Sequence, residues 1–351
     1  MKKIVLSLLL IISLKNNAQV NDVVTNIDWP QDIITHNNDL YIVERSGQRI
    51  IKTDLTDATH QITTLVSGMI NMYGVAIHTN YLYFSQNTTD KIFRIDLTAT
   101  NPTPELVLSN ALGAYSIAFK GDELYICERS NNKIVKINVT ESNPVKTDVV
   151  TINTPEGLFF NGDDLYVSGN NDYKIYKVDT NNPNPTATVL TALSYGIHAQ
   201  GMTVYNNELY FTQANVARVS KIDLSVANAS PEIVVDSGLN GPRALAISGS
   251  NLFISDSSGD KISQLQLGTL SIHENTIADQ SLSLVPNPAN NVIQVRGLQE
   301  LTNYSIYSYL GKKISSGNTN NNTSINIESL EKGVYFIHLE ATKSTLQFIK
   351  I

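Results

Sequence analysis

Residues 72–108 read MYGVAIHTNYLYFSQNTTDKIFRIDLTATNPTPELVL, and this stretch decides the fold. It holds four short runs in which apolar side chains dominate or alternate with polar ones, separated by polar residues that favour turns. Runs of this length and pattern are typical of β-strands. The stretch therefore predicts a unit of four short strands, at 72–77, 81–85, 91–97 and 104–108.

The Leu82-Tyr83 dipeptide of this unit recurs along the chain every 41 to 44 residues. A period of about 40–45 residues with strand patterning is typical of a β-propeller in which each repeat forms one four-stranded blade. Six copies predict an all-β, six-bladed propeller over residues 19–268. The other copies are Leu40-Tyr41, Leu124-Tyr125, Leu165-Tyr166, Leu209-Tyr210 and the variant Leu252-Phe253.

The sixth repeat ends without a fourth strand, because the chain continues from Gly268 into a polar segment. A candidate for the missing strand stands near the N-terminus, where Asp22-Val-Val-Thr25 matches Asp148-Val-Val-Thr151 at the end of the third repeat. Closing the ring in this way removes two open sheet edges. We therefore expect residues 21–27 to pair with the sixth blade.

The Leu-Tyr dipeptide, together with Lys-Ile-x-Lys/Arg-Ile-Asp in the third strand, resembles the NHL and YWTD classes of β-propeller. The likeness is clearest in residues 124–134, LYICERSNNKI. It implies the fold and names no activity.

Basic and acidic residues stand two positions apart in several third strands, so the members of each pair share one face of the strand. We expect them to form solvated ion pairs that contribute about 0–1 kcal/mol each. The pairs are Lys52/Asp54, Arg94/Asp96, Lys177/Asp179 and Lys221/Asp223.

The N-terminus has the pattern of a secretory signal peptide. Lys2 and Lys3 precede the largely apolar run 4–14, and the small residue Ala18 marks a cleavage site. The run is too short for a membrane-spanning helix, which needs about 20 residues. We expect residues 1–18 to direct Sec export into the periplasm, and we expect no transmembrane segment.

Residues 281–351 change to short segments in which apolar and polar residues alternate, and Pro286 and Pro288 end the first of them. Six or seven such strands in about 70 residues predict a small β-sandwich. Residues 269–280 form the linker that joins it to the propeller.

Four motifs of this C-terminal segment resemble the type A C-terminal sorting domain of the type IX secretion system in Bacteroidetes. They are Pro286-Asn-Pro288, the Gly311-Lys312 turn, Leu330-x-x-Gly-Val-Tyr335 and the last strand, which ends in Lys350. The resemblance implies that the type IX machinery binds residues 281–351 and carries the protein across the outer membrane. It implies a secreted protein or one displayed on the outer cell surface.

The 351 residues include 25 basic and 32 acidic side chains, for a net charge of −7, which argues against nucleic-acid binding. The single cysteine, Cys127, excludes an internal disulfide and is expected to be a buried, unreactive thiol inside a strand. No P-loop, G-x-S-x-G or H-E-x-x-H motif occurs. His198 has no visible nucleophile or orienting acid. We therefore expect no bound cofactor and assign no catalytic residue.

Two rings of side chains are expected on the propeller face where the loops enter each first strand and leave each second strand. The first ring precedes the small residue of each first strand and comprises Gln31, Tyr73, Tyr115, Glu156, Gln200 and Arg243. The second ring follows the second strand and comprises Glu44, Gln86, Glu128, Gly169, Gln213 and Asp256, with Arg45 and Arg129 directly after two of its members. Ligand contacts are expected from the first ring and from Glu44, Glu128, Arg129 and Asp256.

These rings leave three functions open. Tyrosine, amide and arginine side chains suit recognition of a peptide, protein or glycan without catalysis. The six-bladed lactonases and gluconolactonases hold a divalent cation at first-ring positions, and this comparison makes Glu156 the best candidate metal ligand of a hydrolase. A propeller that serves as a surface structural component, with a plugged channel, is the third reading.

The carboxylate count weighs against the hydrolase. Glu156 is the one carboxylate of the first ring, and Arg243 would repel a cation there, so we expect Glu156 and Arg243 to pair across the channel. Two further carboxylate or amide oxygens converging beside Glu156 would favour the metal enzyme, whereas tyrosine and arginine in that space would favour binding or a plug.

Overall fold

The computed structural model describes residues 19–194, 196–197, 199–267, 282–298, 301–308, 312–321, 323–340 and 344–351. The chain divides into two compact units between residues 269 and 270. The predicted signal peptide, the linker, His198 and Gly311 lie outside the described residues.

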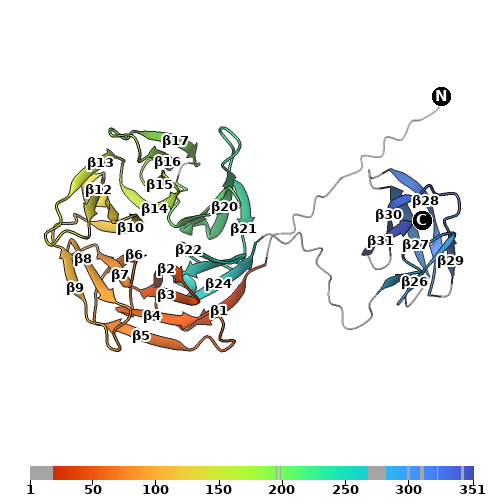
Figure 1. Ribbon diagram of the computed structural model, residues 1–351, viewed down its shortest axis with the longest axis horizontal. Helices are drawn as coiled ribbons and strands as arrows, with labels where there is room; N and C mark the ends of the chain where they lie inside the picture. The colour runs from red at the N-terminus through yellow and green to blue at the C-terminus, as the bar shows by residue number, and fades with distance from the viewer. Residues whose placement is uncertain are drawn as a thin grey trace, which may run out of the picture. The chain divides into compact units, whose positions relative to one another are not determined.

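The described residues of the first unit form six four-stranded antiparallel sheets arranged as blades around a channel (Figure 1). The inner strands, one per blade, contact one another in a closed cycle. The first three blades are β2 (Pro30–His36), β3 (Asp39–Glu44), β4 (Arg49–Asp54) and β5 (Ile62–Ser67); β6 (Met72–His78), β7 (Tyr81–Gln86), β8 (Lys91–Asp96) and β9 (Glu105–Leu108); and β10 (Ala114–Lys120), β11 (Glu123–Glu128), β12 (Lys133–Asn138) and β13 (Thr147–Thr151).

The next two blades follow the same order from the channel outward, and the last completes itself with the N-terminal strand. They are β14 (Pro155–Asn161), β15 (Asp164–Gly169), β16 (Lys174–Asp179) and β17 (Ala187–Ala192); β18 (Met202–Tyr205), β19 (Glu208–Gln213), β20 (Arg218–Asp223) and β21 (Glu232–Val235); and β22 (Pro242–Ser248), β23 (Asn251–Asp256), β24 (Lys261–Gln266) and β1 (Asn21–Thr25). The predicted six-bladed fold is confirmed.

The N-terminal strand closes the ring as predicted. β1 pairs with β24 in antiparallel register, from Asn21 opposite Gln264 to Thr25 opposite Lys261, and the two lie side by side in Figure 1. Lys261 Nζ also lies 2.8 Å from Asp22 Oδ1. The free edge of β24 is thereby paired, and β1 becomes the outer strand of the sixth blade.

The Leu-Tyr dipeptides are buried because each second strand has a neighbouring blade on both faces. Leu40 and Leu82 have no exposed surface, and Tyr83 and Tyr125 are 1% and 2% exposed. The apolar clusters each join two adjacent blades, as in the one that holds Tyr83 from β7 and Leu124 from β11. The repeat is therefore the packing unit between blades.

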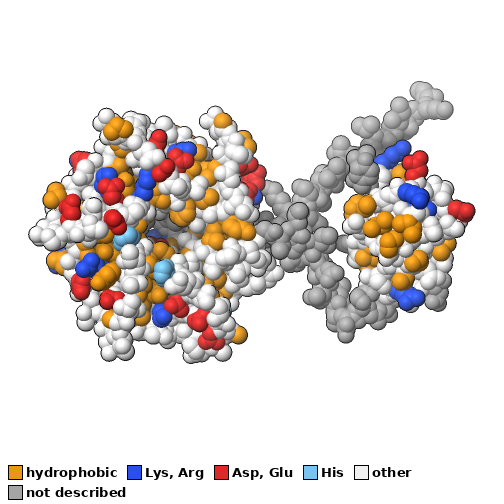
Figure 2. Space-filling view, viewed as in Figure 1, with side chains coloured by type: hydrophobic (Ala, Val, Ile, Leu, Met, Phe, Trp, Pro, Cys, Tyr) orange, Lys and Arg blue, Asp and Glu red, His pale blue; other side chains and the backbone are white. Residues whose placement is uncertain are grey.

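The third-strand ion pairs form differently from the expectation. Lys52 Nζ pairs across the hairpin with Asp39, the residue before Leu40-Tyr41, at 2.7 Å. Asp54 instead accepts hydrogen bonds from the backbone N–H and hydroxyl of Thr56, because it is the last residue of β4 and caps the turn. The same cross-hairpin pairing joins Lys136 to Glu123, Lys177 to Asp164 and Lys221 to Glu208, whereas Arg94 pairs with Glu105. Figure 2 shows the resulting mixture of acidic and basic side chains over the propeller surface.

The second unit is the predicted small sandwich. One sheet has the order β25 (Ser283–Val285), β26 (Val292–Arg296) and β29 (Ser324–Asn326), and the other has the order β28 (Lys313–Thr319), β27 (Thr302–Ser308), β30 (Gly333–Leu339) and β31 (Ser344–Lys350). Ile293, Ile306, Ile337 and Phe348 have no exposed surface and fill the space between the sheets. The strand β28 was not foreseen, because it is an edge strand with mainly exposed side chains. Within the described residues, no helix is long and apolar enough to cross a membrane.

Candidate functional site

Five of the six first-ring side chains stand at irregular points of the inner strands, and the sixth, Gln200, lies just before β18. Pairing between β6 and β7 passes from Met72 opposite Gln86 to Val75 opposite Phe84, which leaves Tyr73 and Gly74 in a bulge. The same irregularity occurs in β2, β10, β14 and β22. A bulge re-aims a side chain out of the normal alternation. Each bulge here directs one side chain toward the channel.

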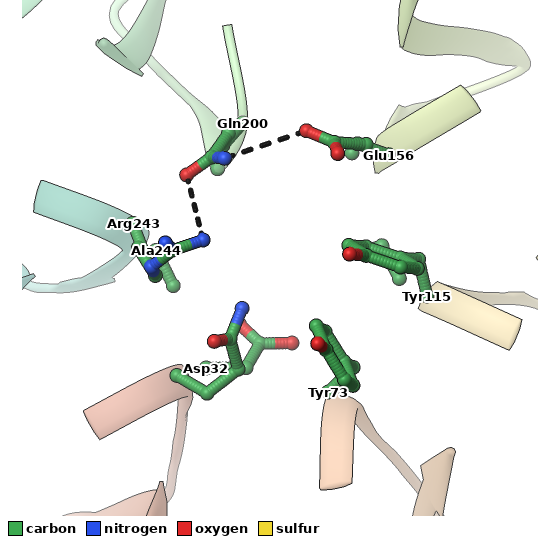
Figure 3. A pocket seen from close by; sticks show the side chains of 11 residues that line it. Asp32, Tyr73, Tyr115, Glu156, Gln200, Arg243 and Ala244 are labelled. Carbon is green, nitrogen blue, oxygen red and sulfur yellow. Dashed lines mark hydrogen bonds between the residues drawn. The ribbon is translucent and has the colours of Figure 1, made fainter. Parts of the chain in front are cut away.

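All six first-ring residues line one cavity of about 50 Å³ at the channel (Figure 3). The cavity is large enough for a few water molecules. It is far smaller than the roughly 300–1,000 Å³ of sites that enclose a small molecule. A single functional group therefore fits inside, and the rest of a larger ligand would lie over the mouth. The other lining residues are Asp32, Ser116, Gly157, Gly201 and Ala244.

Glu156 is held from two sides. Arg129 Nε lies 3.2 Å from Glu156 Oε1, and Gln200 donates from Nε2 to Glu156 Oε2 at 3.4 Å. Gln200 Oε1 in turn accepts from Arg243 at 3.3 Å, as the dashed lines of Figure 3 show. The expected direct pair of Glu156 and Arg243 is thus wrong, because Gln200 lies between them and Arg129 is the close cation.

Three arginines at the mouth each lie over an aromatic ring. The guanidinium carbon of Arg45 is 4.7 Å from the Tyr73 centroid, that of Arg129 is 5.1 Å from Tyr115, and that of Arg243 is 5.5 Å from Trp29. The two tyrosine rings are themselves 4.3 Å apart. Stacking holds a planar guanidinium by its face and leaves its N–H edge available.

Burial shapes the charges of this cluster. It lowers the pKa of Arg243, against the attraction of Glu156, although an arginine in a protein remains protonated. It raises the pKa of Tyr115 above its ordinary value, with smaller contributions from Tyr73 and Glu156. The mouth therefore presents guanidinium cations and neutral phenols.

Asp32 is a member of the site that sequence reasoning missed. It lines the cavity at a position where other blades carry glycine, serine or alanine. Its carboxylate accepts backbone hydrogen bonds from Val75 in the next blade and from Ile33, both at 2.9 Å. Desolvation outweighs these bonds and raises the pKa of Asp32 to about 7. The break in the small-residue pattern of the first strands was the available signal.

Several buried polar atoms at or beside the mouth have no hydrogen-bond partner among the described residues. They are Gln31 Oε1 in the cavity lining, Arg129 Nε, and Trp29 Nε1 under Arg243. Gln31 as a whole is only 8% exposed. Because unpaired buried polar groups are rare in folded proteins, each of these atoms requires an explanation.

A repeated hydroxyl fixes the backbone beneath the ring. Ser85 Oγ accepts from the Gly74 N–H at 2.8 Å and donates to the Tyr115 carbonyl of the next blade at 2.5 Å. Thr212, Ser168 and Ser255 occupy the same place in their blades and accept from the inner strand in the same way. Cys127 holds the equivalent position in the third blade, where burial raises the pKa of its thiol well above the usual value. The single cysteine is therefore a buried member of this row.

The second ring does not line the cavity. Glu44, Glu128 and Asp256 have no exposed surface, and each carboxylate accepts the backbone N–H of the loop that enters its own blade. Glu44 also pairs with Arg49, and Glu128 lies 2.6 Å from Lys146 Nζ. These acids are consequently inaccessible to a ligand, and we remove them from the candidate site. Arg129, next to Glu128 in the chain, stays in it.

The residues beside Glu156 do not suit a divalent cation. A hard cation needs several oxygen ligands, whereas the two groups facing Glu156 are the Arg129 guanidinium and the amide nitrogen of Gln200. Within the described residues, no group of three or more His, Cys, Asp or Glu side chains is placed to hold a metal. The geometry thus gives the metal-dependent hydrolase no support.

Solved structures with a similar fold are described as different kinds of protein. The PQQ-bound form of aldose sugar dehydrogenase from Streptomyces coelicolor is 17% identical, with a TM-score of 0.57 over 71% of this chain and 97% of that one. A chain of the nidogen/laminin complex is 16% identical, with a TM-score of 0.54 over 63% and 87%. Streptogramin B lyase is 14% identical, with a TM-score of 0.51 over 72% and 88%. At these identities the likeness shows the fold alone.

No curated protein is detectably similar to the chain in sequence. The family described as the secretion system C-terminal sorting domain matches residues 283–351, which indicates type IX secretion and export to the cell surface or outside. The family described as a repeat of unknown function (DUF6923) matches residues 11–158 and, overlapping them, 71–195. Together these two matches span more than half of the chain. The chain therefore belongs to the DUF6923 repeat family and carries a secretion system C-terminal sorting domain.

Proposed function

We propose that the propeller is an exported recognition module that binds a peptide, protein or glycan through its channel mouth. The observation that carries this proposal is Gln31 Oε1, which is buried in the cavity lining without a hydrogen-bond partner among the described residues, beside Arg129 Nε, which is ion-paired with Glu156 but makes no hydrogen bond there. If side chains only plugged the channel, we would expect its polar groups to be hydrogen-bonded to one another. A buried donor or acceptor without a hydrogen bond costs about 1–3 kcal/mol.

The proposed role is that of an exported protein. The sorting domain indicates type IX secretion, and the N-terminal pattern supports Sec transport of the chain to the periplasm first. We infer that residues 1–18 are a signal peptide, 19–268 the propeller, 269–280 a linker and 281–351 the sorting domain.

The two enzyme readings that the fold suggests fit the cavity less well. A cofactor-sized ligand such as the one named for the aldose sugar dehydrogenase needs a site of several hundred Å³, against about 50 Å³ here. A metal-dependent lactonase needs oxygen ligands where Glu156 meets Arg129 and Gln200.

A binding screen with matched variants tests the proposal. The purified chain is applied to glycan and peptide arrays as the wild type, as Arg243→Gln and as Arg94→Gln. Arg94 is a fair control, because like Arg243 it lies over an aromatic ring and has a polar side-chain partner, but it lies outside the cavity lining. We expect ligands whose signal falls in Arg243→Gln and persists in Arg94→Gln.

Two outcomes would overturn the proposal. The first is the absence of any ligand that is sensitive to Arg243→Gln. The second comes from a panel of lactones and esters assayed in parallel: hydrolysis that Glu156→Gln abolishes would establish an enzyme instead.

A further inference from the structure

The channel mouth carries an excess of positive charge in an otherwise acidic chain. Arg243 lines the cavity, Arg45 and Arg129 lie over the rings of the lining residues Tyr73 and Tyr115, and the acidic groups of the lining are Glu156 and Asp32. Arg129 neutralises Glu156, and both oxygens of Asp32 accept backbone N–H groups. Among the described residues, the Arg45 and Arg243 guanidiniums therefore have no carboxylate in an ion pair with them.

The donors of these guanidiniums are largely unused. Within the described part of the chain, the Arg45 guanidinium has no hydrogen-bond or ion-pair partner, and its one described contact is the stack on Tyr73. Arg243 makes a single long bond to Gln200 at 3.3 Å. Arg129 Nε is buried without a hydrogen bond, although it lies near Glu156. The aromatic rings restrict the orientation of the three guanidiniums, so their N–H groups are preorganised for an acceptor.

We infer that the mouth binds a carboxylate at the end of a flexible stem, as an acidic side chain or the C-terminal carboxylate of a peptide presents it. Guanidinium edges match the planar, two-oxygen geometry of a carboxylate. This inference rests on the proposed recognition function and specifies its ligand class.

The small cavity favours a peptide over a glycan. A volume of about 50 Å³ admits one carboxylate but not a sugar ring. The carboxylate of a uronic acid is attached directly to its ring, which would meet the rim before the carboxylate reached Arg243. An aspartate, glutamate or C-terminal carboxylate lies at the end of a narrow stem. The Tyr73 face that a sugar would stack on is already covered by Arg45.

Fluorescence anisotropy on the full chain tests the inference with defined probes. The probes are labelled octaglutamate, octaglutamine with an amidated C-terminus, oligogalacturonate of similar length, and inorganic phosphate as a competitor. The proteins are the wild type, Arg45→Gln, Arg45→Lys and the control Arg94→Gln. Arg45→Gln removes an arginine that makes no described bond to the rest of the fold.

We expect octaglutamate to bind more tightly than the other probes, with an affinity that falls as salt is raised. Arg45→Gln should weaken this binding roughly tenfold or more, the effect of losing one charged hydrogen-bonding partner. The affinity of Arg45→Lys for octaglutamate should lie between those of the wild type and Arg45→Gln, because lysine keeps the positive charge but lacks the planar guanidinium. Arg94→Gln should change the affinity by less than about twofold, as expected for a screened charge outside the site.

Several results would overturn the inference. Equal binding of octaglutamine would show that the carboxylate is irrelevant, and tighter binding of oligogalacturonate would assign the mouth to an acidic glycan. Equal losses in Arg45→Gln and Arg94→Gln would indicate diffuse electrostatics. Binding of uncharged array ligands that Arg243→Gln abolishes, without any octaglutamate binding, would refute the carboxylate and leave the recognition function standing. The absence of every ligand would refute both.

Discussion

Two rings of polar side chains come from neighbouring positions of the same repeats, yet they differ in almost every physical respect. The second ring, at the ends of the second strands, is fully buried, and its carboxylates hold the loops that enter the blades. The first ring, at or just before the start of the inner strands, lines a cavity, and its Gln31 Oε1 is buried without a hydrogen-bond partner among the described residues.

The difference teaches that charge beside a channel is not by itself a sign of function. Glu128 and Arg129 are adjacent in the chain, and only Arg129 reaches the mouth. What separates structural from available groups is whether the protein has already used their hydrogen-bonding capacity. Substitutions at three residues can break or sharpen this comparison.

The largest effect is expected from the second ring. Asp256→Ala removes the acceptor of the Asn240 and Gly241 N–H groups, and Gly241 is buried, so its N–H is left without this partner away from water. We expect the free energy of unfolding of the propeller to fall by about 2–4 kcal/mol, measured by urea denaturation. Asp256→Asn keeps one acceptor oxygen, so its free energy of unfolding should fall by less. A loss under about 1 kcal/mol for Asp256→Ala would erase the contrast between the rings.

A pH-dependent effect is expected from Asp32. Its folded pKa of about 7 lies above the ordinary 3.8, so the native state holds a proton that the unfolded state releases between these values. The contribution of Asp32 to stability should therefore fall by a few kcal/mol at most as the pH rises from about 4 to about 7, and change no further above that range.

The asparagine of Asp32→Asn cannot ionise, so the stability of this variant should lack the part of the pH dependence that Asp32 causes. The measurement is the urea midpoint of wild type and variant across the pH range. Parallel curves for the two proteins would show that Asp32 titrates normally.

The smallest effect is expected from Gln31. Its Oε1 is buried and has no partner among the described residues, so replacing the amide by an apolar group of similar size sacrifices no described bond. We expect Gln31→Leu to leave the free energy of unfolding unchanged or to raise it by up to about 1 kcal/mol. Thermal denaturation provides the measurement. A clear destabilisation would move Gln31 into the structural class of the second ring.

The fold was predictable because packing between blades repeats in the sequence. The period of Leu40-Tyr41 and its copies identified six blades, and the match of Asp22 to Asp148 identified the closing strand. The first ring followed from the same register, because each member stands one residue before a position that is glycine, serine or alanine in five of the six blades.

Partners across blades and hairpins were not predictable in the same way. Lys52 shares a strand face with Asp54, but its extended side chain reaches Asp39 on the neighbouring strand, and only the tertiary register reveals this. The pairing of Glu156 with Arg129, and not with Arg243, depends on the course of the loop after β11. The pKa of Asp32 depends on burial by the second blade, and no local pattern encodes that burial.

The pairing of β1 with β24 has a consequence for how the chain folds. Ser263 donates a hydrogen bond to Asp22, 241 residues away in sequence, so closure of the ring is the most non-local step of the propeller. Contacts of such separation carry the largest loop-closure entropy and form late. The last strand of the propeller must therefore be available before the first can dock. The N-terminal strand can therefore complete the sixth blade only on chains that include β24, which ends at Gln266.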